Sequence, residues 1–114
     1  MPRGLRMGMG GRMLGNMMDP RSRLFMALAS DQRLKILDLL KEEEKSSADL
    51  IKALDLDASV ISRHLMLLRN VGLVSARKEG VALYFSIADP RVFQIVELAT
   101  QVIRDWLDQH QAFF

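Results

Sequence analysis

The stretch "ASVISRHL", residues 58–65, places two serines, an arginine and a histidine among apolar residues that have helical spacing. Ile61, Leu65 and, beyond them, Leu68 form one apolar stripe, and Asp57 before them is a typical N-cap residue. The polar side chains therefore lie on other faces of the same helix. They are either the solvated face of a core helix, the start of a reactive site or a set of contacts for a ligand.

A second short helix precedes this stretch. Ser46 or Ser47 caps it, apolar residues recur along it at helical spacing, and "DLD" at residues 55–57 breaks it. The helix of the opening stretch then continues to Gly72, a helix-stopping residue. Two short helices with a brief turn between them predict a helix-turn-helix.

The period of the sequence changes after Gly72 from helical to alternating. "LVSARK" at residues 73–78 and "VALYFSI" at residues 81–87 are typical of strands, and Glu79 with Gly80 forms the turn between them. This segment predicts a β-hairpin directly behind the helix-turn-helix.

Three further helices are predicted from capping residues and apolar periodicity, at residues 19–29, 30–41 and 89–110. The acidic residues 42–44 are typical of a solvated helix end or turn, and we assign them no function. The last helix starts at Asp89 and Pro90 and carries apolar residues on more than one side, which indicates a partner. The predicted fold is mainly helical with one β-hairpin, a winged helix-turn-helix that dimerises through its N-terminal and last helices.

The length of 114 residues fits one compact domain, and 49% hydrophobic with 26% charged residues is typical of a globular protein. Residues 1–18 contain six of the eight methionines and five of the seven glycines, so we expect an arm that is flexible or packs on a partner subunit. Residues 19–110 form the expected domain and residues 111–114 a tail. No apolar run approaches the length of a membrane span or of a secretory signal, so we expect a cytoplasmic protein without membrane contact.

Residue types that support catalysis or metal binding are scarce. The chain has no cysteine and two histidines, which excludes thiolate chemistry and disfavours ordinary imidazole metal sites. Nothing in the sequence places a carboxylate or nucleophile beside His64, and His110 is typical of a helix end. We therefore predict no enzyme activity, no catalytic residue, no metal site and no cofactor.

The net charge is a mild +2, but the basic residues are concentrated in two places. Residues 1–23 hold five arginines against one aspartate, a net +4, and residues 58–80 hold four basic residues against Glu79. Local positive charge of this kind is typical of a nucleic-acid binder. The alternative interpretation is that these charges only keep the protein surface solvated.

The opening stretch then resembles the recognition helix of such a protein. Residues near the N-terminus of that helix read base edges in the major groove, where Arg63 can bind guanine through two hydrogen bonds. His64, at the side of the helix, makes a phosphate contact or a supporting hydrogen bond. The predicted DNA contacts, with two basic wing residues beside the turn, are Ala58, Ser59, Ser62, Arg63, His64, Arg77 and Lys78.

Over about residues 20–108 the sequence resembles the ArsR/SmtB family of bacterial transcriptional repressors, most specifically in "SVISRHLMLLRNVGLV" followed by a basic turn and "LYFSI". The resemblance implies a homodimer on a two-fold symmetric operator, with its recognition helices in successive major grooves about 34 Å apart. It also implies an inducer that lowers DNA affinity.

The metal-sensing positions of the family differ in this chain. Where many members have two cysteines, this sequence has Ser46 and Ala48, and a second site that bridges the last helices is matched by Asp89, Arg91, Val102 and Asp105. We therefore expect no control by a thiolate-bound metal. Three explanations stay open: an unidentified small molecule held in the dimer interface, a site built from oxygen ligands and the arm, or a repressor that is controlled by its own level or by another protein. The alternative to a DNA-binding repressor is a winged-helix interaction module that does not read DNA.

Overall fold

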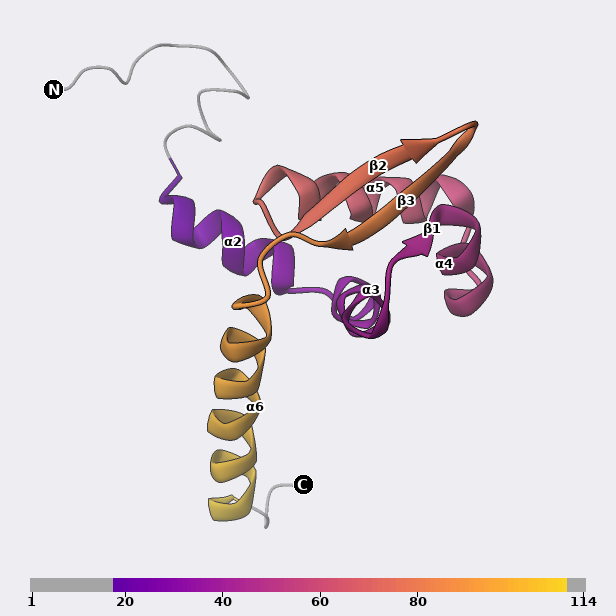
Figure 1. The fold of residues 1–114 in the computed structure, drawn as a ribbon. Coiled ribbons are helices and arrows are strands. Elements are labelled where there is room, and N and C mark those ends of the chain that lie inside the picture. The colour runs from indigo at the N-terminus through magenta and orange to yellow at the C-terminus, as the bar shows by residue number, and fades with distance from the viewer. Residues whose placement is uncertain (1–17, 111–114) are drawn as a thin grey trace, which may run out of the picture.

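The computed structural model describes residues 18–110 and contains helices and strands in the predicted order (Figure 1). The elements are α2 (Pro20–Leu28), α3 (Asp31–Glu42), β1 (Lys45–Ser46), α4 (Ser47–Leu54), α5 (Ala58–Asn70), β2 (Val74–Glu79), β3 (Ala82–Ile87) and α6 (Val92–Gln109). The mainly helical architecture with a β-hairpin is confirmed. The predicted arm, except for Met18, and the tail at 111–114 lie outside the described residues.

The helix starts follow local capping chemistry. The side chains of three predicted caps accept backbone N–H hydrogen bonds: Asp19, Ser30 and Ser46. Asp49 completes a capping box by accepting from the Ser46 backbone N–H at 3.1 Å, so both orphan donors of this turn are paired. Asp57 occupies the N-cap position of α5, but its side chain makes no capping hydrogen bond.

The core lies between the helix-turn-helix, α3 and the base of the hairpin. The predicted stripe of α5 is confirmed, because Ile61 and Leu68 are fully buried and Leu65 nearly so. Other parts of the chain contribute the remaining buried side chains: Ala27, Ile36, Leu37, Leu40, Leu50, Leu73, Val74, Phe85 and Val92. This core fixes α5 with its polar residues outward.

The sheet has three antiparallel strands in the order β1-β3-β2, one more than predicted. β1 is only two residues long, so it carries no alternation by which a sequence pattern could reveal it. The predicted turn was displaced by one residue, because Glu79 pairs with Ala82 and leaves Gly80 and Val81 as the connection. Gly80 takes the left-handed φ of +64° that such a tight hairpin requires.

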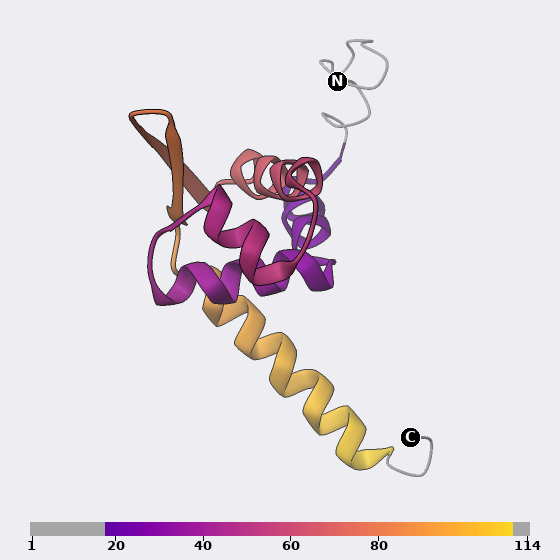
Figure 2. The same ribbon diagram turned by 90° about the vertical axis from the view of Figure 1, so that its right-hand side faces the viewer.

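The last helix begins later than predicted and leaves the body of the molecule. Residues 89–91 form a turn in which Asp89 accepts the Arg91 backbone N–H, and α6 starts at Val92. Figures 1 and 2 show α6 projecting away from the helix-turn-helix and the hairpin. Five large apolar side chains of α6 are exposed in the single chain: Leu98, Val102, Ile103, Trp106 and Leu107. No helix within residues 18–110 has the length and apolar character needed to cross a bilayer.

Candidate nucleic-acid interface

The first turns of α5 present a polar face to solvent. A three-residue turn separates α4 from α5, and Asp55 within it adopts a left-handed φ of 54°. Four residues of the predicted contact set are exposed: Ser59, Ser62 and Arg63 on the side of α5 away from its buried stripe, and Ala58 at the start of the helix. The structure therefore brings these four onto one open surface, as a recognition helix requires.

His64 lies at the edge of this surface, half-buried, and is held by Arg33 of α3. The Arg33 Nη1 lies 3.1 Å from the His64 Nδ1. A guanidinium can only donate, so Nδ1 is the acceptor and the ring proton is on Nε2. Burial, together with the positive charges of Arg33 and Arg63, lowers the pKa of His64. The imidazole is thus neutral, with one donor left.

The lowered pKa of His64 should make the free energy of unfolding depend on pH. Its usual pKa is 6.5 and its folded pKa is lower, so below about pH 6.5 the unfolded chain binds a proton that the folded chain resists. We expect the free energy of unfolding to fall as the pH drops from about 6.5 toward the folded pKa, and His64→Gln to remove this part of the slope. Urea unfolding at equal protein concentration measures it. Equal slopes in both proteins would contradict the expectation.

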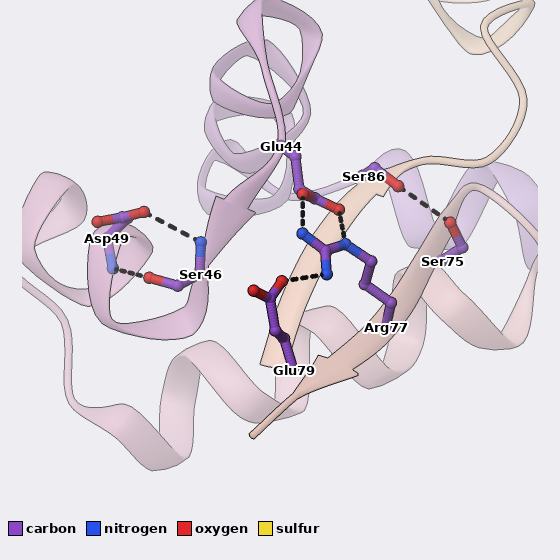
Figure 3. Close-up of polar contacts among 7 residues, drawn as sticks. All are labelled: Glu44, Ser46, Asp49, Ser75, Arg77, Glu79 and Ser86. Carbon is purple, nitrogen blue, oxygen red and sulfur yellow. Dashed lines mark hydrogen bonds and ion pairs between the residues drawn. The ribbon is translucent and has the colours of Figure 1, made fainter. Parts of the chain in front are cut away.

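The hairpin carries two predicted contacts in different environments, and Figure 3 shows the surroundings of the first, Arg77. Arg77 donates to both carboxylate oxygens of Glu44 at 2.8 Å, and its Nη1 donates to Glu79 at 2.6 Å. Its guanidinium also lies 4.8 Å from the centre of the Tyr84 ring. The hydrogen bonds from Arg77 lower the pKa of Glu44, so this cluster stays ionised at neutral pH. Lys78 is exposed, and no ion pair involves it within residues 18–110.

Two residues that contact the predicted set were not predicted from the sequence. Arg33 carries no distinguishing pattern, because its partner His64 is 31 residues away in the chain. Glu44 belongs to a run that is typical of solvent exposure, and its partner Arg77 is 33 residues away. Both contacts depend on tertiary structure, so no local signal could have revealed them.

Three of the positions that the resemblance aligns with metal sites make other contacts in this structure: Ser46, Asp89 and Arg91. The Ser46 hydroxyl caps α4, and Ala48 beside it offers no ligand atom. Asp89 pairs with Arg91 at 2.7 Å, and hydrogen bonds from Arg91 lower the pKa of the Asp89 carboxyl to about 2. Among residues 18–110, no three His, Asp or Glu side chains gather where they could hold a metal ion.

A groove between α2 and α6 forms a second candidate surface. It has a volume of about 540 Å³ and is lined by mostly apolar side chains, among them Phe25, Leu28, Ile95, Ala99, Ile103 and Leu107. Ile103 is 57% exposed and Phe25 58% exposed in the single chain. An apolar surface of this extent on a small domain is typical of a protein interface.

Known proteins are similar to this chain in both sequence and fold. The family described as "Bacterial regulatory protein, arsR family" matches residues 30–76. The "Probable mercury resistance operon repressor" of Streptomyces lividans is 38% identical over 87 residues, which cover 76% of this chain and 70% of that protein. The crystal structure of Rv0081 from M. tuberculosis has a TM-score of 0.71 at 33% identity, over 79% of this chain and 91% of that chain.

A third relative is described as a homodimer. The solution structure of the homodimeric winged helix-turn-helix DNA-binding domain Mb0332 from Mycobacterium bovis has a TM-score of 0.70 at 33% identity. The match covers 90% of this chain and 94% of that domain, so it includes the helix-turn-helix, the hairpin and the flanking helices. Agreement in sequence and in fold over this length establishes the relationship, and the chain belongs to the arsR family of bacterial regulatory proteins.

Proposed function

We propose that this chain is a transcriptional repressor that binds a two-fold symmetric DNA operator as a homodimer. The observation that carries the proposal is the exposed polar face at the start of α5, on a fold shared with a homodimeric DNA-binding domain. Arg63 reads guanine, Ser59 and Ser62 reach other base edges, and Ala58 lies against a thymine methyl. The protein has no catalytic role in this proposal, and it acts in the cytoplasm, where bacterial DNA lies.

The second copy of the chain occupies the groove between α2 and α6. Support comes from the exposed apolar side chains on both helices and from the homodimeric relative, which matches the chain over 90% of its length. A dimer that covers these apolar side chains removes apolar area from water, and this burial is the main driving force for such association. The same dimer sets the spacing of the two α5 helices.

The wing contributes phosphate contacts of unequal strength. Lys78 is exposed and supplies a point charge to the DNA backbone. Arg77 contacts DNA as well, but it does so in competition with Glu44 and Glu79, which already share its guanidinium. A phosphate must therefore replace or join these carboxylates.

The inducer is proposed to be a small molecule and not a thiolate-bound metal. The chain contains no cysteine, although one relative is named for mercury resistance. Hg(II) and Cd(II) should leave operator binding unchanged at concentrations that saturate thiolate sites. Release of DNA by either ion, measured by fluorescence anisotropy, would contradict this part of the proposal.

Selection of bound duplexes from a random pool tests the function directly. We expect enriched duplexes with two inverted half-sites about one helical turn apart. A reporter gene placed behind the enriched sequence should be repressed when the protein is expressed. No enrichment at low salt, together with a stable complex with another protein, would instead favour an interaction module that does not read DNA.

Removing the Glu44 carboxylate should strengthen binding to every duplex. In Glu44→Gln, Arg77 loses an anionic partner at 2.8 Å and becomes more available to phosphate. We expect severalfold tighter binding with an unchanged sequence preference, and a log–log salt slope steeper by up to about 0.9 per added phosphate contact. Asp38→Asn, which removes an exposed carboxylate from α3, is the charge-matched control. Equal affinity and slope in the two variants would contradict a masked arginine.

A further inference from the structure

Arg33 joins three segments of the chain through its side chain. Its Nε donates to the Ala27 carbonyl at 2.7 Å and its Nη2 to the Met26 carbonyl at 3.1 Å. Its Nη1 donates to the His64 Nδ1 at 3.1 Å. One guanidinium thus connects the end of α2, the start of α3 and the recognition helix α5.

The two carbonyls belong to the last turn of α2, where backbone oxygens lack the i+4 N–H partner of the helix interior. The Met26 carbonyl also accepts the Ala29 backbone N–H at 3.1 Å. A cation at this end of a helix is favoured by the helix dipole as well as by the hydrogen bonds. The same turn of α2 carries Leu28 and is followed by Ala29, and both line the groove assigned to the second copy. Arg33 is therefore anchored to the dimerisation helix.

The third contact sets the chemistry of His64. Because the guanidinium is always protonated, it keeps the proton off Nδ1 and on Nε2. The charged groups that act on the ring are Arg33 from α3 and Arg63 from its own helix, both positive. The imidazole therefore offers Nε2–H as a fixed donor at the edge of the DNA-facing surface.

We propose that Arg33 is a positioning residue for DNA binding: it holds His64 as the neutral Nε2–H tautomer that donates to a DNA phosphate, and it ties the recognition helix to α2. This inference rests on the proposed function. Arg33 lies outside the DNA-facing surface, and in this proposal it aligns one contact on that surface, His64.

The test compares variants of the full chain on two probes, the most enriched duplex and a scrambled duplex of equal length. Arg33→Gln should weaken binding to the enriched duplex by about tenfold, since it frees His64 to rotate and change tautomer. His64→Gln should cause a similar loss, and the double variant should lose no more than either alone, because the two residues act as one unit. Lys35→Gln, which removes an exposed charge from the same helix, should bind as the unchanged protein does.

A spectroscopic measurement separates positioning from general stabilisation. Nitrogen-15 NMR of the unchanged protein should show the His64 Nδ1 unprotonated and Nε2 protonated, and Arg33→Gln should give a tautomer mixture. If Arg33→Gln does not fold, Arg33→Lys replaces it, because one ammonium cannot reproduce three hydrogen bonds in a plane. Additive losses in the double variant, or an unchanged histidine spectrum, would overturn the inference. Failure of the unchanged protein to bind any duplex would overturn the proposed function instead.

Discussion

Arg63→Ala is expected to reduce the preference for the operator over a scrambled duplex by about a hundredfold. A bidentate arginine–guanine pair is worth about 1–3 kcal/mol of discrimination, and a symmetric dimer loses it twice. Arg63 lies on the exposed face of α5, so its truncation leaves the core intact and the melting temperature nearly unchanged. Titration of both duplexes, followed by fluorescence anisotropy at one salt concentration, measures the ratio.

Two variants separate base reading from charge in this experiment. Lys78→Ala should weaken both duplexes alike and flatten the salt dependence, because a phosphate contact carries no sequence information. Arg69→Ala removes an equal charge from the C-terminal end of the same helix and should keep the preference. If Arg63→Ala retained the full preference for the operator, Arg63 would not read a base.

The elements that the sequence predicts well are those whose signal is local. Ser30 and Ser46 begin helices through their own side chains, and Ile61, Leu65 and Leu68 define a stripe within a single helix. The exposed face of α5 follows from that stripe by helical geometry. For the same reason, the amino-acid sequence is sufficient to place Ser59, Ser62 and Arg63 on the solvent side of α5.

The features that were missed depend on pairs of residues far apart in the chain. β1 exists because Lys45 and Ser46 meet β3, and two residues are too few to show a strand period. The tight turn was displaced because Val81 is typical of a strand, yet it takes a loop position beside Gly80. Local pattern indicates what a segment prefers, whereas the environments of Arg77 and His64 are set by Glu44 and Arg33 after folding.

Ile103→Glu is expected to convert the dimer into monomers and to lower operator affinity by about a hundredfold or more. The side chain is 57% exposed in the single chain and lines the groove between α2 and α6. In the dimer the substitution buries a carboxylate among apolar residues, at a cost of several kcal/mol. A monomer engages one half-site, so it loses the gain of about 10²–10⁴ that linked binding provides.

The matched control for this variant is Gln94→Glu, which adds the same charge to an exposed position of α6 outside the groove. It should remain a dimer by sedimentation and bind the operator normally. Because Ile103 contributes little to the core of one chain, the monomeric variant should keep its helical circular dichroism. A duplex with a single half-site engages only one protomer of the dimer. The variant and the unchanged protein should therefore bind this duplex with similar affinity. A dimeric Ile103→Glu protein with full operator affinity would mean that another surface joins the two copies, and that the groove serves a different partner.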